Sequence, residues 1–311
     1  MGGRSQAEVE EQEDDQAVRF GVVILPETRW RDGATIWRRA EALGFDHAWT
    51  YDHIAWRSLR DSPWYGTIST LAAAASVTER MRLGPLVASP NFRHPVPFAR
   101  ELIALDDLSD GRLVLGVGAG GLGWDATVLG QDEWSRRERT DRFAEFVELT
   151  DRLLREPTTT YRGRYYSADN APMQPGCVQS PRVPFAIAAT GPRGMRLAAD
   201  HGQTWVTTGD REVSGLLDAR AGAEVVRRQT TQLQEACERV GRDPATLDRL
   251  VVTGPRLEPG LTSVESFRDT VGRYAEIGVT DLVVHWPRAT EPYAEDLAMF
   301  ERIFSDYAGH Y

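Results

Sequence analysis

Short apolar runs alternate along the chain with longer segments in which apolar residues recur at helical spacing. The first four runs cover 19–25 (RFGVVIL), 46–50 (DHAWT), 82–87 and 112–117, and a helix-type pattern follows each of them. Buried strands that are joined in this way by helices are expected to lie parallel to one another in one sheet.

The same alternation continues through the second half of the chain. Further strands are expected at 184–189, 203–207, 250–253 and 281–285. Eight strand-then-helix units favour an α/β fold that is a closed (β/α)8 TIM barrel with insertions, rather than an open doubly wound sheet. Helices are expected at 35–43, 67–77, 95–108, 136–154, 190–199, 212–240, 264–276 and 294–304, and an inserted hairpin at 158–169.

Composition agrees with one globular domain. The chain has 311 residues, of which 41% are hydrophobic and 26% charged, an ordinary balance for a globular protein. No linker divides it, so residues 18–311 are predicted to form a single domain. Residues 1–17 are rich in Glu and Asp and have no apolar core, which predicts a disordered acidic tail rather than a secretory signal.

Charge and cysteine content narrow the class of partner. The formal net charge is −10, which argues against nucleic acid, because such a partner requires a clustered basic surface. No apolar run approaches the ~18 residues that a membrane-spanning helix needs. Cys177 and Cys237 lie too far apart for a disulfide framework or a metal-binding set. We therefore expect a cytoplasmic protein without a metal site, which acts on a small molecule and can form a homodimer.

Candidate catalytic residues are sought just after the strands, because barrel enzymes keep their sites at the carboxyl ends of the strands. Asp52 and His53 follow the second strand. A histidine beside a carboxylate can exchange a proton near neutral pH; the alternative is a histidine whose ring is satisfied by the loop backbone. Ser89, after the third strand, either bonds the edge of a planar ring or belongs to a plain turn.

Three further groups of residues are candidates for binding. The glycines at 118–121 follow the fourth strand, where they either let a ligand approach the backbone closely or form a tight turn. The segment 190–193 (TGPR) begins a helix, and it is either an anion site or an ordinary N-cap threonine. Aromatic loop residues can wall a cofactor and substrate or cover the barrel end as core: Trp56, Trp64, Tyr65 and Trp124.

Four segments together resemble the bacterial luciferase-like family of flavin- and deazaflavin-dependent oxidoreductases. They are ALGFDHAWTYDH, TERMRLGPLVASPNFRHP, LDDLSDGRLVLGVGAGG and AATGPRGMRLAADHGQTW, which lie in the family's order within residues 19–210. The resemblance implies a barrel that binds FMN or the deazaflavin coenzyme F420 at its carboxyl end. The segments DSPWYG, ASPNFRHP and TGPRGMRLAA are more similar to the deazaflavin-using branch.

The resemblance also implies roles for individual residues. His53 and Asp52 would lie beside the cofactor ring, and Leu86-Val87 would press on its far face through an unusual backbone bend, which we predict to be a non-proline cis peptide. The other implied contacts are Ser89, Gly118, Ala119 and Gly120 at the edge of the ring, and Thr190, Gly191, Pro192 and Arg193 on the phosphate side.

The expected activity is F420-dependent hydride transfer to or from a small organic substrate. The alternatives are a monooxygenase that uses reduced FMN and oxygen, and a flavin-binding barrel without turnover. The sugar-phosphate dehydrogenases of the family carry a glutamate where this chain has Gly121, and this difference weighs against a glucose-6-phosphate reaction.

Overall fold

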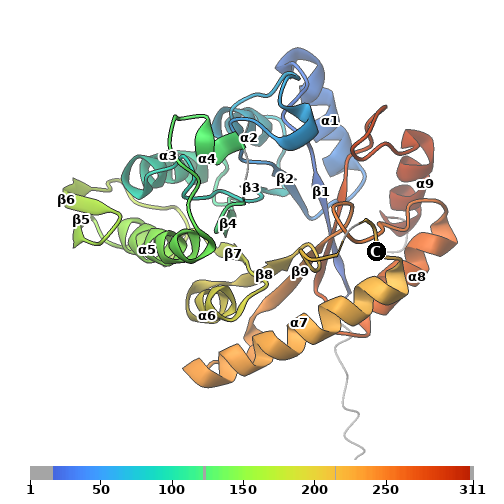
Figure 1. Cartoon of the computed structure of the whole chain (residues 1–311). Helices are drawn as coiled ribbons and strands as arrows, with labels where there is room; N and C mark the ends of the chain where they lie inside the picture. The colour runs from blue at the N-terminus through green and yellow to red at the C-terminus, as the bar shows by residue number, and fades with distance from the viewer. Residues whose placement is uncertain (1–16, 122–123, 214, 309–311) are drawn as a thin grey trace, which may run out of the picture.

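A ring of parallel strands forms the centre of the molecule (Figure 1). The structure is a computed structural model that describes residues 17–121, 124–213 and 215–308. Within these residues, eight strands are hydrogen-bonded in the order β3-β2-β1-β10-β9-β8-β7-β4. They are β1 (Arg19–Val23), β2 (His47–Thr50), β3 (Arg82–Pro85), β4 (Leu115–Gly118), β7 (Phe185–Ala188), β8 (Thr204–Thr207), β9 (Asp248–Val252) and β10 (Asp281–His285).

The two ends of this strand order meet, so the sheet closes. Parallel bridges join Leu83 to Leu113 and Ala88 to Val117, between the β3 and β4 segments. The predicted TIM barrel is therefore confirmed. The peptide bond between Leu86 and Val87, just after β3, is cis and does not involve proline, as predicted.

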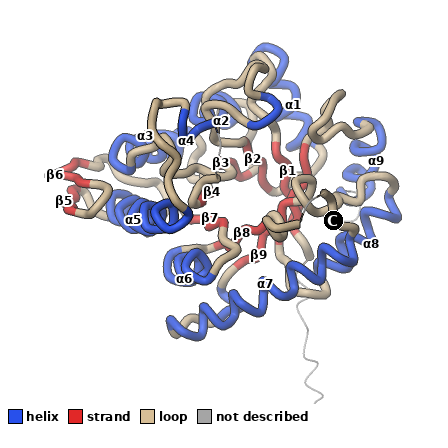
Figure 2. Tube along the Cα trace, viewed as in Figure 1, coloured by secondary structure: helices blue, strands red, loops and turns tan. Residues whose placement is uncertain are grey.

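Helices surround the barrel and alternate with its strands (Figure 2). They are α1 (Trp30–Ala42), α2 (Thr67–Ala75), α3 (Pro95–Leu108), α4 (Trp124–Thr127), α5 (Arg136–Arg155), α6 (Pro192–His201), α7 (Ala219–Val240), α8 (Val264–Ala275) and α9 (Leu297–Ala308), with 3-10 turns at η1 (Arg57–Leu59) and η2 (Pro244–Thr246). None of the helices in the described residues is long and apolar enough to cross a membrane.

Some helix boundaries differ from the prediction. The long helix α7 begins at Ala219 rather than at 212, because Asp218 caps it by accepting a hydrogen bond from the N–H of Ala221 at 2.8 Å. Helix α1 begins at Trp30, five residues earlier than predicted. The expected hairpin is confirmed as β5 (Thr158–Arg162) and β6 (Ser167–Pro172), which project from the barrel beside α5 (Figure 1).

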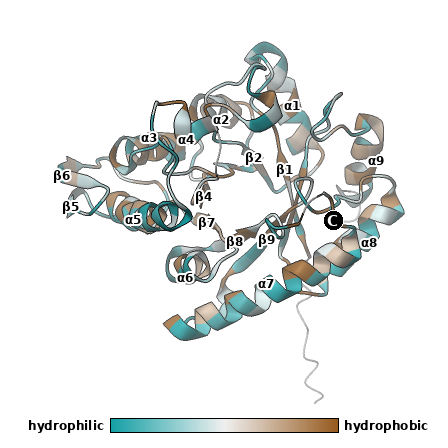
Figure 3. Ribbon diagram, viewed as in Figure 1, coloured by the Kyte–Doolittle hydropathy of each residue, from teal (hydrophilic) through white to brown (hydrophobic). Residues whose placement is uncertain are grey.

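Apolar side chains fill two layers, as the alternation along the strands requires. In β1, Val22 packs in the layer between barrel and helices, whereas Val23 packs with Trp49 and Val283 inside the barrel. The central strands are accordingly mostly apolar in Figure 3. Residues 1–16 of the expected acidic tail lie outside the described residues.

The amino end of the barrel holds a paired charge network. Arg19 donates two hydrogen bonds to Asp281, at 2.8 and 2.6 Å, and Asp281 also lies 3.0 Å from Nε2 of His47. Trp49 donates its indole N–H to Nδ1 of His47 at 2.6 Å. Since an indole can only donate, Nδ1 must accept, and His47 is the neutral tautomer that donates from Nε2 to Asp281.

Candidate functional site

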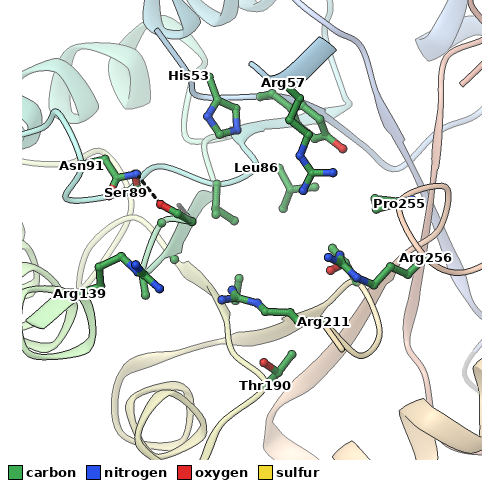
Figure 4. Close-up of a pocket in the computed structure, with 18 of the residues that line it drawn as sticks. His53, Arg57, Leu86, Ser89, Asn91, Arg139, Thr190, Arg211, Pro255 and Arg256 are labelled. Carbon is green, nitrogen blue, oxygen red and sulfur yellow. Dashed lines mark hydrogen bonds between the residues drawn. The ribbon is translucent and has the colours of Figure 1, made fainter. Parts of the chain in front are cut away.

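A cavity of about 1070 Å³ opens at the carboxyl end of the barrel strands, within the usual size range for a cofactor site. The loops after β2, β3, β4, β7, β8 and β9 all contribute to it (Figure 4). Nine of the sequence-predicted site residues line it: His53, Trp56, Leu86, Val87, Ser89, Gly118, Ala119, Gly120 and Thr190.

His53 has a carboxylate partner, but this partner is not Asp52, its neighbour in the sequence. Nδ1 of His53 is hydrogen-bonded to Oδ2 of Asp125, in the short helix α4. The other oxygen of Asp125 accepts the backbone N–H groups of Ile54 and Ala55 at 2.7 and 3.2 Å. Because an ionised carboxylate only accepts, Nδ1 carries a proton, and in the neutral imidazole Nε2 is then the acceptor. Figure 4 shows the His53 ring at one end of the cavity.

Asp52 was expected to lie beside the cofactor ring together with His53, but the structure places its side chain away from the cavity. Asp52 is 1% exposed and accepts two hydrogen bonds from the guanidinium of Arg93, at 2.5 and 2.7 Å. Arg93 also bonds Glu101 in α3 at 3.0 Å. Asp52 does not line the cavity. This bidentate pair joins the β2 loop to the segment before α3.

The predicted glycine loop at 118–121 packs closely against the loop that follows β3. A Cβ at Gly118 would lie 2.8 Å from the Val87 side chain, and one at Gly120, whose φ is +72°, would lie 2.5 Å from Oδ1 of Asn91. These glycines therefore give room to the loop after β3, besides lining the cavity. Gly121 has open space around it. Oδ1 of Asn91 is buried and has no hydrogen-bond partner.

The predicted aromatic wall is formed only in part by the residues expected. Trp56 lines the cavity and stacks on Trp64, with ring centroids 6.0 Å apart. Trp64 lies behind it and donates its indole N–H to the His53 carbonyl at 2.9 Å. Tyr65 is 41% exposed and does not line the cavity. The side chain of Trp124 lies outside the described residues.

The predicted anion site at the start of α6 also meets the cavity only in part. Thr190 lines it, whereas Gly191 and Pro192 do not. Arg193 is exposed and forms an ion pair with Asp141 in α5. The structure therefore does not bring Arg193 to the cavity.

A second histidine lies below the cavity, beside two tyrosines. The Tyr51 hydroxyl is 2.7 Å from Nε2 of His285 and 3.1 Å from the Tyr293 hydroxyl, and both tyrosines line the cavity. Burial lowers the pKa of His285 to about 3 and raises the pKa of Tyr51 well above its usual value. All three side chains are therefore neutral near pH 7.

Arginine is the most frequent charged residue of the cavity wall. Arg57, Arg136, Arg139, Arg211, Arg228 and Arg256 line it, beside the carboxylates Asp125, Glu133, Asp210 and Glu212. No salt bridge joins any of these arginines to a carboxylate within the part of the chain that the structure describes. Burial, and after it the positive charges of Arg256, Arg139 and Arg136, lowers the pKa of Arg211.

Sequence reasoning missed Asp125 and these arginines, and also Asn91, Tyr51 and Tyr293, which line the cavity. Asp125 lies 72 residues from His53, and no local motif joins the two. The arginines occur singly in polar loops and at helix starts, where a solvated surface is the ordinary reading. Their position in the sequence is a signal for a site, since Arg211 and Arg256 each come a few residues after an expected strand.

Comparisons with known proteins agree with this geometry. Residues 17–253 match the bacterial luciferase family, described as luciferase-like monooxygenases. The chain is 32% identical over 243 residues to a 4-hydroxyprotoasukamycin monooxygenase of Streptomyces nodosus subsp. asukaensis, covering 75% of this chain and 62% of that protein. It is 29% identical over 309 residues to an F420-dependent glucose-6-phosphate dehydrogenase of Beutenbergia cavernae, covering 83% of this chain and 89% of that protein.

A solved structure supports the fold. The coenzyme F420-dependent tetrahydromethanopterin reductase of Methanopyrus kandleri superposes with a TM-score of 0.71 at 18% identity, covering 93% of this chain and 96% of that one. Because the family model matches more than half of its length, the chain belongs to the bacterial luciferase-like family. The family expected from the sequence is thereby confirmed.

Proposed function

We propose that the protein is an oxidoreductase that uses coenzyme F420 to transfer hydride to or from a small organic substrate. The observation that carries this proposal is the meeting, in one large cavity, of the His53–Asp125 pair with the wall formed by Leu86 and Val87. Similarity to an F420-dependent dehydrogenase along 83% of the chain supports the deazaflavin rather than FMN.

The residues present suit such a cofactor. The cavity volume, about 1070 Å³, accommodates a tricyclic ring with its side chain. Leu86 and Val87 would face the ring, and Ser89 with 118–120 would lie at its edge. The buried Oδ1 of Asn91 lacks a partner and could accept from a polar ring edge. Thr190 and Arg139, which both line the cavity, would hold the phosphate.

The chain's own contribution to the reaction is to orient groups and move a proton. A bound deazaflavin supplies the hydride donor or acceptor. His53 takes the proton from a substrate hydroxyl, or returns it, at Nε2, because Nδ1 is occupied by Asp125. Asp125 fixes this tautomer and steadies the positive charge that His53 acquires. Trp56 and Tyr293 exclude water from one side of the cavity.

A second candidate is a monooxygenase that uses reduced FMN and oxygen. The similarity to a monooxygenase at 32% identity favours it. A third is a barrel that binds a flavin without turnover. The three candidates differ in which cofactor binds and in whether the bound cofactor transfers hydride, reacts with oxygen or does not turn over.

Titration of the purified protein with F420 and with FMN, followed by fluorescence, separates these candidates. We expect F420 to bind more tightly than FMN, and its reduced form to be reoxidised by at least one member of a panel of enones, imines and ketones, or its oxidised form to be reduced by an alcohol. Tight FMN binding with substrate-dependent oxygen uptake would establish the monooxygenase instead. Binding without turnover on the whole panel would support the third candidate. Ala119→Phe, which narrows the cavity, should abolish binding while circular dichroism stays unchanged.

A further inference from the structure

Two arginines reach into the cavity from the loops after β8 and β9. Figure 4 shows Arg211 and Arg256 on the far side of the cavity from Ser89 and Asn91. Neither forms a salt bridge within the residues that the structure describes. Two other arginines of the barrel are paired: Arg19 with Asp281 and Arg93 with Asp52. Arg112 and Arg249 have no salt bridge in the described residues, but their guanidinium groups donate to backbone carbonyls.

Unpaired guanidinium groups that line the same cavity wall are unfavourable near one another unless an anion joins them. Like charges repel, and a wall of protein weakens the screening by water. The positive neighbours of Arg211, among them Arg256, already lower its pKa. Nε of Arg256 is buried without a hydrogen-bond partner. These features are typical of a site that is completed by an oxyanion, which a guanidinium binds through two parallel hydrogen bonds.

The whole wall favours an anion, although the chain as a whole is acidic. Six arginines and four carboxylates line the cavity, whereas the formal net charge of the chain is −10. One carboxylate, Asp125, is already taken by His53. A cavity of this kind concentrates small anions from solution.

We infer that Arg211 and Arg256 bind the phosphate or carboxylate group of the substrate, so that the substrate is a small organic anion. This inference rests on the proposed function, which assigns Thr190 and Arg139 to the cofactor phosphate and leaves the β8–β9 side of the cavity to the substrate. Held there by its anionic group, the substrate directs its reacting carbon toward the ring and toward His53.

The test is calorimetric titration of inorganic phosphate into the protein saturated with F420. We expect phosphate to bind the saturated wild type, and Arg211→Gln and Arg256→Gln each to weaken it by ~10-fold or more, the worth of a hydrogen bond to a charged group. Arg211→Lys, which keeps the charge, should lose less. The matched control is Arg196→Gln in α6, whose side chain is 74% exposed and outside the cavity; it should change nothing. F420 affinity should stay within about threefold in all variants.

Two results would overturn the inference. If phosphate binds the free protein but not the F420-saturated protein, and Arg211→Gln weakens F420 binding, the two arginines serve the cofactor. If phosphate binds the saturated protein equally in all variants, it binds elsewhere. Failure of the proposed function looks different: F420 would not bind the wild type, while phosphate would still bind and would still require Arg211 and Arg256.

Discussion

The two ends of the barrel treat charge in opposite ways. At the amino end, Asp281 is 4% exposed and is fully engaged by Arg19 and His47. At the carboxyl end, Arg211 and Arg256 face a cavity without a carboxylate partner in the described residues. The pairs of Asp281 contribute to the stability of the fold, whereas Arg211 and Arg256 lie where a bound anion can pair with them. We therefore expect the charged groups at the amino end to contribute mainly to stability, and those of the cavity at the carboxyl end to binding and chemistry.

Two buried histidines repeat this contrast. His47, at the amino end, lies between an indole donor and the carboxylate of Asp281. His285, at the carboxyl end, lies against Tyr293 with ring centroids 3.6 Å apart and bonds the Tyr51 hydroxyl, a neutral partner. The protein therefore has one histidine that is hydrogen-bonded to a carboxylate and one that is hydrogen-bonded to a neutral hydroxyl.

The largest expected effect belongs to His53. His53→Gln keeps a hydrogen-bonding side chain but cannot titrate, so turnover per bound cofactor should fall by roughly 10²- to 10⁴-fold. The free energy of unfolding should stay within about 0.5 kcal/mol, because His53 is partly exposed at the cavity. Steady-state rates, normalised to bound cofactor, and urea unfolding provide the two measurements.

Asp125→Asn sharpens the same test. The amide can still accept the N–H groups of Ile54 and Ala55 but no longer fixes the proton on Nδ1 of His53. A loss of about 10- to 100-fold in turnover is expected, the range seen when a partner that orients a histidine ligand is removed. An unchanged rate in either variant would remove the pair from the mechanism.

At the amino end, Asp281→Asn should cost stability and leave the chemistry intact. The free energy of unfolding should fall by about 2 kcal/mol, less than the roughly 3–5 kcal/mol of a fully buried pair, because Arg19 stays partly in solvent. Burial alone would raise the pKa of Asp281, but hydrogen bonds from His47 and Arg19 lower it. This stabilisation is therefore present above the unfolded-state pKa, ~3.9, and is lost as the pH falls below it.

Urea unfolding from pH 7 to pH 3 measures this effect. The difference between wild type and Asp281→Asn should shrink as the pH approaches 3. Turnover per bound cofactor at pH 7 should match the wild type. A variant that lost turnover without losing stability would contradict the division between the two ends.

The smallest effect, over the single interval from pH 6 to pH 5, is a slope in stability that comes from His285. Its pKa is about 3 in the folded protein and ~6.5 when unfolded. Because only the unfolded chain takes up this proton, stability should fall by about 1.4 kcal/mol for each pH unit below 6.5. In His285→Asn that slope should be smaller by this amount between pH 6 and pH 5. Equal slopes in the two proteins would show that His285 charges without unfolding.

The fold could be predicted from sequence because its signals are local. Apolar runs such as 19–25 and 281–285 are spaced by helices, and their alternation is enough to specify eight parallel units. Helix boundaries do not follow from this alternation alone, since the start of α7 is set by the capping side chain of Asp218. His53 was found because the barrel fold places sites just after its strands.

The sequence by itself determined the barrel, the end at which its site lies and the presence of a histidine there. Only the tertiary structure decided which groups meet. In the folded chain His53 is hydrogen-bonded to the carboxylate of Asp125, and Asp52 is paired with Arg93. The tertiary structure also brought Arg211 and Arg256 to one cavity wall while pairing Arg193 with Asp141 outside it. The physical reason is that strand periodicity depends on neighbouring residues, whereas these contacts depend on loop paths that bring together residues 41 and 72 positions apart.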